Sequence, residues 1–301
     1  MTIPFIKYSR VLLTASALLM VVAFFFLFKW GLKPGIDFTG GSLLETTYSE
    51  TRPDLEEMQK IFADAGLTET VVQKTDANSY IVRSNFIDED LHQSILKDIR
   101  DKFQTKENVV RESRFETIGP SVSAALKQRA WWAVIFVCLG IIAYVAYAFR
   151  AVSRPVASWK YGLLAIVALA HDVMFVVGVF AVLGHFLNIE VDVGFVVALL
   201  TVLGYSVNDT IVVYDRIREN LLRHSADNFG EVVNNGLNQT LMRSVNTTIK
   251  TLLPLVALFF WGGATIHTFV LALLIGIASG AYSSIFIAAP LLVVVEKWQR
   301  R

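Results

Sequence analysis

A few ionisable and amide residues interrupt long apolar stretches of this sequence, and their types and positions suggest chemistry. Asp209 follows Asn208 near the end of one apolar run, and Arg243 lies at the start of the next. An earlier run contains the adjacent pair His171 and Asp172. An ionisable side chain inside a bilayer costs several kcal/mol unless it is paired or hydrated, so such residues are candidates for ion or proton transfer.

Asp209 is the strongest candidate for a proton carrier. Burial in hydrocarbon disfavours a charged carboxyl group and a nearby cation favours it, so a carboxyl group between these effects can load and release a proton near neutral pH. Arg243 is the candidate cation. It provides a constant positive charge and does not carry protons, because an arginine stays charged. We expect protonation of Asp209 to switch its contact with Arg243. The alternative is that Arg243 extends to the lipid headgroups and Asp209 caps nearby backbone.

The pair His171 and Asp172 admits two interpretations. His171 can relay a proton while Asp172 hydrogen-bonds a neighbouring span as a neutral acid, or both residues form a structural polar clamp. Hydroxyl groups for a water path are available in the fifth run, although threonine in a helix usually bonds to carbonyls of its own helix. These residues are Thr247, Thr248 and Thr251.

The elements that position these residues are predicted to be membrane-spanning helices. The 301 residues are 54% hydrophobic and 18% charged, whereas a soluble chain carries about 25% charged residues. A bilayer core about 30 Å thick needs about 20 apolar residues in a helix. Runs of this kind cover residues 11–28, 131–149, 162–183, 193–213, 243–261 and 268–295. We predict an all-α bundle of six transmembrane helices and exclude a soluble, disordered or nucleic-acid-binding protein.

Basic residues predict the orientation of the spans. Thirteen Lys and Arg residues lie in the N-terminal segment, between spans two and three, between spans four and five, at the start of span five, and after span six. The short connections 185–192 and 262–267 contain none. The positive-inside rule then places both termini in the cytoplasm.

Three regions follow from this topology. Residues 1–30 hold the cytoplasmic N-terminus and the first span, which we expect to be retained as an anchor because no small-residue cleavage site follows it. Residues 31–130 form a polar extracytoplasmic domain with 13 basic and 17 acidic residues. Residues 131–301 hold spans two to six and a cytoplasmic amphipathic loop, 215–240, divided in two at Ser225–Asn228.

The polar domain alternates strand and helix signals. Strands are expected at residues 42–48, 70–75, 79–84 and 109–118, with helices at 53–65 and 89–103. Asp88 is expected to cap the second helix. The β-α-β-β-α-β order predicts a ferredoxin-like α+β domain. We expect the lone His92 to be an ordinary surface residue.

Three motifs resemble the SecD/SecF protein-export family: GIDFTGG at residues 35–41, GYSVNDTIVVYDRIREN at 204–220 and NQTLMRS at 238–244. The resemblance covers nearly the whole chain. It implies a fold related to the resistance-nodulation-division transporters and association with a SecD-like subunit, the Sec channel and the translocating polypeptide. It also implies coupling of proton flow to late steps of protein translocation, with no metal or other cofactor. The single Cys138 independently excludes a multi-cysteine metal site.

The resemblance also suggests roles for individual residues. It places Asp209 and Arg243 in a proton pathway, and Asn208, His171 and Asp172 are further candidates for it. The family is expected to have a small or hydroxyl-bearing residue near this position, whereas this chain has Lys250. Paired glycines most simply form a turn, but the family implies a joint between membrane and outer domain. The residues of that joint are Asp37, Phe38, Thr39, Gly40 and Gly41.

Small residues recur every four positions in the sixth span, at Ala272, Gly276 and Gly280. Such a stripe lets another helix approach closely, and it can serve internal packing or contact with the SecD-like subunit. Internal packing is the simpler interpretation.

We therefore predict a multi-pass protein of the bacterial inner membrane that contacts lipid, exports protein with a SecD-like partner, and is not an enzyme. One alternative is half of a proton-coupled small-molecule exporter of the same superfamily, and another is a passive scaffold. An intramembrane protease is disfavoured because LGYSVND lacks the Gly-x-Gly-Asp pattern, and because zinc-protease and serine-nucleophile motifs are missing.

Overall fold

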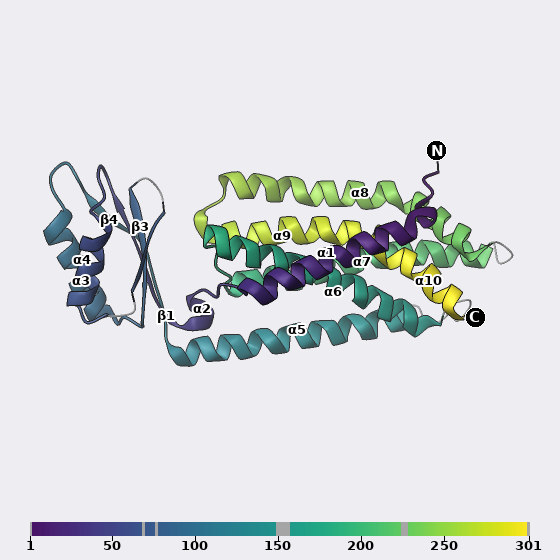
Figure 1. Ribbon diagram of the computed structural model, residues 1–301, viewed down its shortest axis with the longest axis horizontal. Coiled ribbons are helices and arrows are strands. Elements are labelled where there is room, and N and C mark those ends of the chain that lie inside the picture. The colour runs from purple at the N-terminus through teal and green to yellow at the C-terminus, as the bar shows by residue number, and fades with distance from the viewer. Residues whose placement is uncertain (1, 68–69, 76–77, 149–156, 224–227, 300–301) are drawn as a thin grey trace. The chain divides into compact units, whose positions relative to one another are not determined.

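The chain divides into two compact units. The computed structural model describes residues 2–67, 70–75, 78–148, 157–223 and 228–299. The smaller unit covers Pro34–Ala130, and the larger one combines Met1–Lys33 with Trp131–Arg301 (Figure 1). The larger unit is helical, and the smaller one combines helices with one sheet.

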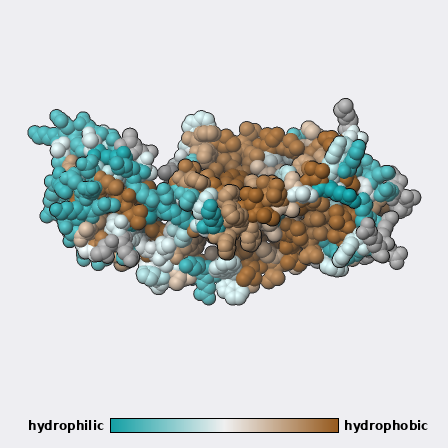
Figure 2. All heavy atoms as spheres, in the orientation of Figure 1, coloured by the Kyte–Doolittle hydropathy of each residue, from teal (hydrophilic) through white to brown (hydrophobic). Residues whose placement is uncertain are grey.

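Long helices dominate the larger unit. They are η1 (Phe5–Tyr8) with α1 (Ser9–Trp30), α5 (Pro120–Ala148), α6 (Ser158–Leu187), α7 (Val193–Arg223), α8 (Phe229–Trp261), and α9 (Ala264–Ser283) continued by η2 (Ser284–Ala288) and α10 (Ala289–Gln299). The start of α5, up to Ala130, belongs to the smaller unit. Within the described residues, six helical segments are long and apolar enough to cross a membrane. Hydrophobic residues cover most of this unit's visible surface, and hydrophilic residues gather at the end that carries both chain termini (Figure 2). The six predicted spans are therefore present.

Several helices are longer than the sequence pattern predicts. α5 begins at Pro120 rather than Trp131, and the predicted amphipathic loop continues the spans, since α7 runs to Arg223 and α8 begins at Phe229. The physical reason is that the apolar side chains of this segment, including Ile217, Val233 and Leu237, are fully buried in the bundle core.

The start of α8 is a capped helix end. The side chain of Asn228 accepts a hydrogen bond from the Gly230 amide at 3.0 Å, which satisfies one of the free amides of the first turn. The predicted break begins at Ser225, and residues 225–227 lie outside the described part of the chain.

The smaller unit contains a four-stranded antiparallel sheet. Its elements are α2 (Ile36–Thr39), β1 (Gly41–Tyr48), α3 (Leu55–Asp64), β2 (Val71–Lys74), β3 (Ser79–Ser84), α4 (Glu89–Phe103) and β4 (Val110–Ile118). The strand order is β2-β3-β1-β4. Asp88 caps α4 as expected, because its Oδ1 accepts from the Leu91 amide at 2.9 Å.

The prediction for His92 was wrong. Its side chain lies on the face of α4 that packs on the sheet and is 4% exposed. The ring stacks on Phe115, and Nε2 lies 3.1 Å from Oε1 of Glu112. His92 stands one helical turn before the buried Ile95 and Leu96, so helical periodicity places it on the apolar face rather than at the surface.

Candidate functional site

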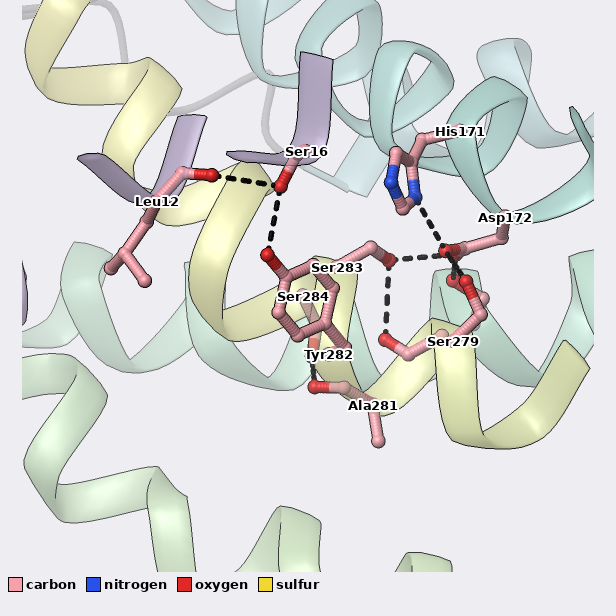
Figure 3. A network of polar contacts seen from close by, with 11 residues as sticks. Leu12, Ser16, His171, Asp172, Ser279, Ala281, Tyr282, Ser283 and Ser284 are labelled. Carbon is pink, nitrogen blue, oxygen red and sulfur yellow. Dashed lines mark hydrogen bonds and ion pairs between the residues drawn. The ribbon is translucent and has the colours of Figure 1, made fainter. Parts of the chain in front are cut away.

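Asp172 lies at the centre of a buried hydrogen-bond network that joins three helices. Its carboxyl group on α6 is 0% exposed. It accepts hydrogen bonds from Ser206 on α7 at 2.6 Å and from Ser279 and Ser283 on α9 at 2.8 and 2.6 Å (Figure 3). Three hydroxyl donors offset the cost of removing this group from water. The network therefore fixes α6, α7 and α9 around one ionisable group.

His171 lies between this carboxyl group and an apolar groove. Its Nδ1 is 3.3 Å from Oδ1 of Asp172, and its ring stacks against those of Phe175 and Tyr282. The groove, about 470 Å³ in volume, is lined largely by apolar side chains of α1, α6 and α9. The Nε2 atom of His171 is buried and has no hydrogen-bond partner among the described residues. Tyr282 in turn bonds to Ser16 on α1 at 2.9 Å (Figure 3).

Asp209 on α7 is half-buried and is held by serines from two other elements. Ser244 on α8 donates to Oδ1 at 2.6 Å, and Ser284 on η2 donates to Oδ2. η2 is a π-helical turn, and such turns are often found at functional sites. The carboxyl group is thus the point at which α7, α8 and η2 meet through polar contacts.

Arg243 does not lie against Asp209. Its side chain is exposed on α8, and across the described ranges no carboxylate forms an ion pair with it within 4.0 Å. Asn208 is also exposed, on α7. The structure therefore brings Asp209 together with serines rather than with Arg243.

Polar residues continue along the exposed side of α8. We define the α8 polar face as Arg243, Asn246, Thr247 and Lys250, all of which are exposed. Thr247 and Thr251 donate to the carbonyl groups of Arg243 and Thr247 at 2.8 and 3.0 Å. These two hydroxyls therefore bond to their own helix, as threonines in helices usually do.

The small residues of α9 lie against α7 within this chain. A Cβ atom on Gly276 would lie 2.3 Å from Cγ2 of Val202, and one on Gly280 would lie 2.8 Å from Cβ of Ser206. Ala272 is 0% exposed. Ser279 and Ser283 of the same helix bond to Asp172 on α6.

The paired glycines form a sharp turn in the smaller unit. Asp37, Phe38 and Thr39 lie in the single helical turn α2, and β1 begins at Gly41. Gly40 and Gly41 have φ angles of 74° and 116°, which favour glycine. A Cβ atom on Gly41 would lie 2.5 Å from the carbonyl oxygen of Ser84. The turn thus requires glycine for its conformation and for close contact with β3.

The residues that sequence reasoning missed are the serines. They are Ser206, Ser244, Ser279, Ser283 and Ser284. Serine is common in membrane helices and usually bonds to its own backbone, so its type alone gives little signal. The spacing of Ser279 and Ser283, four positions apart beside the glycine stripe, was the available signal.

The third motif has several structural roles. Asn238 donates to the Ile3 carbonyl at 2.9 Å and accepts from the Ile3 amide at 2.8 Å. Gln239 accepts from Nε of Arg216 at 2.6 Å. Ser244, at the end of the motif, contacts Asp209.

Comparison with known proteins identifies the family. Residues 98–298 match the family described as "Protein export membrane protein SecD/SecF, C-terminal". The chain belongs to the SecD/SecF family. Residues 25–51 also match its "SecD/SecF GG Motif", which includes the glycine turn of α2 and β1.

Relatives within the SecD/SecF family match along nearly the whole chain. Protein translocase subunit SecF of Thermobaculum terrenum is 40% identical, covering 98% of this chain and 94% of that protein. The SecF subunit of Anaerolinea thermophila is 38% identical over 97% of this chain and 94% of its own length. The chain is therefore a SecF-type protein translocase subunit and a multi-pass membrane protein of bacterial type.

A solved structure also matches. The crystal structure of SecDF, a translocon-associated membrane protein from Thermus thermophilus, is similar with a TM-score of 0.83 and 33% identity. All of this chain is covered, but it spans only 39% of the SecDF chain.

Proposed function

We propose that this SecF-type subunit uses the proton gradient, together with a SecD-like subunit, to promote late steps of protein translocation through the Sec channel. The observation that carries the proposal is Asp209, a carboxyl group held by Ser244 of α8 and Ser284 of η2 inside an apolar helix bundle. Such a group can change its charge and its helix contacts together. The translocating polypeptide is the substrate, and protons are the coupling ion.

Proton uptake by Asp209 changes the direction of its hydrogen bonds. As a carboxylate it only accepts, so both serine hydroxyls donate to it. A protonated Asp209 carries a donor of its own, and one of the two contacts must then rotate or break. Because the partners belong to α8 and η2, the change shifts the packing of these elements against α7. Arg243, exposed on α8, acts as the positive charge that Asp209 meets in another arrangement.

The α8 polar face supports a SecD-like partner. Exposed Lys and Asn side chains on a membrane-spanning helix are costly against lipid, and a polar surface on a partner subunit removes this cost. The similar region covers only 39% of the SecDF chain, so that protein contains further chain beyond the part that resembles this one. We place the SecD-like subunit against α7 and α8, where it also covers Asn208.

We further propose that both termini are cytoplasmic and that residues 31–130 lie outside the inner membrane. The absence of Lys and Arg from 185–192 and 262–267 supports this orientation. The smaller unit is a ferredoxin-like domain in this proposal, supported by its β-α-β-β-α-β order and its β2-β3-β1-β4 sheet. The glycine turn at Gly40 and Gly41 then serves as the joint between the domain and α1.

The proposal is tested by Asp209→Asn in proteoliposomes that contain the SecD-like subunit, the Sec channel and the export motor. Asn keeps the size of the side chain but carries no titratable group. We expect loss of the stimulation of export by an imposed proton gradient, with motor-driven export retained. Asp215→Asn, further along α7 at an exposed position, is the matched control. Full stimulation in Asp209→Asn would refute the proposal.

A further inference from the structure

The larger unit contains a charged cavity at one end of the apolar region. It has a volume of about 440 Å³, within the range of about 300–1,000 Å³ that is usual for small-ligand sites. α7 and α8 supply most of its wall, and Ala148 at the end of α5 contributes to one side. Its charged lining residues are Asp215, Arg216, Arg218, Glu219 and Arg243.

The charges of this lining do not cancel. Arg218 pairs with Asp215 at 3.4 Å, and Arg216 pairs with Glu219. Both carboxylates are therefore occupied by an arginine of their own helix. Arg243 has no ion-pair partner within the described residues, so the cavity carries one uncompensated positive charge. A negatively charged ligand complements it.

Arg216 is held in place before any ligand arrives. Its Nε donates to Oε1 of Gln239 at 2.6 Å, and the same oxygen accepts from Asn220 at 2.9 Å. A guanidinium group fixed in this way loses little side-chain freedom on binding. Its Nε and one terminal nitrogen are engaged by Gln239 and Glu219, and its remaining donors are suited to a phosphate oxygen. Arg216 and Arg243 thus face one space with donors suited to phosphate.

The position of the cavity indicates where such a phosphate comes from. Ala148, Ile211 and Val212 give part of its lining an apolar character, whereas the next residues along α7 are charged. This transition from apolar to charged side chains corresponds to the level of lipid headgroups. Basic pockets between membrane helices at that level bind acidic headgroups.

We propose that this cavity binds a phosphate-bearing anion, supplied by the headgroup of an anionic phospholipid, through Arg243 and Arg216. The apolar part of the lining contacts the start of the acyl chains, and the headgroup phosphate balances the charge of Arg243. Binding is measured without a proton gradient. Arg243 takes part in both proposals, so Arg216, which has no part in the proposed export step, distinguishes a failure of this site from a failure of export.

The test is native mass spectrometry of the full chain in neutral detergent, titrated with phosphatidylglycerol, phosphatidylcholine or inorganic phosphate. We expect phosphatidylglycerol to bind about tenfold more tightly than phosphatidylcholine, and Arg243→Gln or Arg216→Gln to remove that preference. Arg223→Gln is the matched control. It removes the same charge from α7, at a residue that pairs with Glu219 at 2.7 Å but does not line the cavity.

Arg243→Lys and Arg216→Lys test whether a lost preference results from misfolding. Both variants keep the positive charge, so we expect them to retain part of the preference for phosphatidylglycerol. Thermal unfolding in the same detergent checks each protein. Equal binding of the two lipids to the wild type, or an equal loss in Arg223→Gln, overturns the proposal. Competition by millimolar inorganic phosphate with no preference between lipids also overturns it, because the anion then comes from solution.

Discussion

Ser283 and Ser284 are neighbours in the chain, yet they donate hydrogen bonds to two different carboxyl groups. Ser283 contacts Asp172 at 2.6 Å, and Ser284 contacts Asp209. The change from α9 to the π-helical turn η2 occurs between them. Two ionisable groups on different helices are therefore connected through one peptide unit.

Ser284→Ala is expected to weaken the coupling of export to the proton gradient. A hydrogen bond to a charged acceptor contributes about 1.5–3 kcal/mol, so we expect about a tenfold loss of gradient-dependent stimulation in reconstituted vesicles. Ser16→Ala is the control, because Ser16 bonds to Tyr282 rather than to a carboxyl group. An unchanged response in Ser284→Ala contradicts the assigned role of this contact.

Asp172 and Asp209 are expected to be energetically coupled. We predict that the destabilisation measured for Asp172→Asn and Asp209→Asn is non-additive in the double variant, by about 0.5–3 kcal/mol. The measurement is thermal unfolding in detergent of the wild type, the two single variants and the double variant, which together form a double-mutant cycle. Pairing Asp209→Asn with Asp98→Asn in the smaller unit provides the comparison, and it should give additive values. Additivity in both cycles would show that Ser283 and Ser284 do not couple Asp172 to Asp209 energetically.

Gly276→Ala is expected to destabilise the bundle by about 1–3 kcal/mol. The added Cβ atom meets Val202 at 2.3 Å from Cγ2 and 2.8 Å from Cγ1, so rotation of the valine does not relieve the overlap. Gly140→Ala on α5 is the matched control, since its Cβ atom has nothing within 4 Å. We expect this control to be neutral or slightly stabilising, because alanine restricts the unfolded chain. Equal melting temperatures for the two variants would contradict the packing described.

The smaller unit is expected to lose stability at high pH through Tyr48. Burial raises the pKa of Tyr48 from 10.0 to about 12, and the side chain is 1% exposed. Between these values the unfolded chain loses the phenol proton while the folded chain keeps it. The contribution of this group is therefore complete below pH about 10 and disappears as the pH rises toward about 12.

The measurement for Tyr48 is circular dichroism of the full chain across that pH range. A shift of this size corresponds to about 2–3 kcal/mol. Tyr48→Phe should reduce the loss of stability between pH about 10 and about 12. Tyr8→Phe, at a position that is 53% exposed, should lose stability as the wild type does. The same alkaline loss in all three proteins would assign it to other groups.

The elements of the fold follow largely from local patterns in the sequence. Apolar length predicts the six spans, and a period of 3.6 or 2 predicts the helices and strands of the smaller unit. The cap at Asp88 is predicted by residue type alone. The errors arise where tertiary contact overrides a local signal. His92 is polar, but its position on α4 places it against the sheet, and the 215–240 segment continues two helices because its apolar residues join the bundle core.

In the candidate site, the aspartates could be predicted from the sequence but their partners could not. Asp209 and Asp172 stand out because charge is costly in an apolar run. Their partners are serines from other elements, namely α7, α8, α9 and η2, and only the tertiary packing of these elements brings them together. The distance from Asp209 to Arg243 was not predictable, because adjacent spans at the same depth can present their side chains in different directions.

The wide turn at Ser284–Ala288 also sets the phase of the C-terminal helix. A π-helical turn contains one residue more than an α-helical turn, and each residue of an α-helix adds about 100° of rotation. If residues 284–288 instead continued α9 as a regular α-helix, the extra residue would turn α10 by about 100° relative to α9. With α9 held against α7, Leu292 and Val293, which are buried, would leave the core. The packing of α10 in the core thus depends on the wide turn, which accommodates one extra residue between α9 and α10.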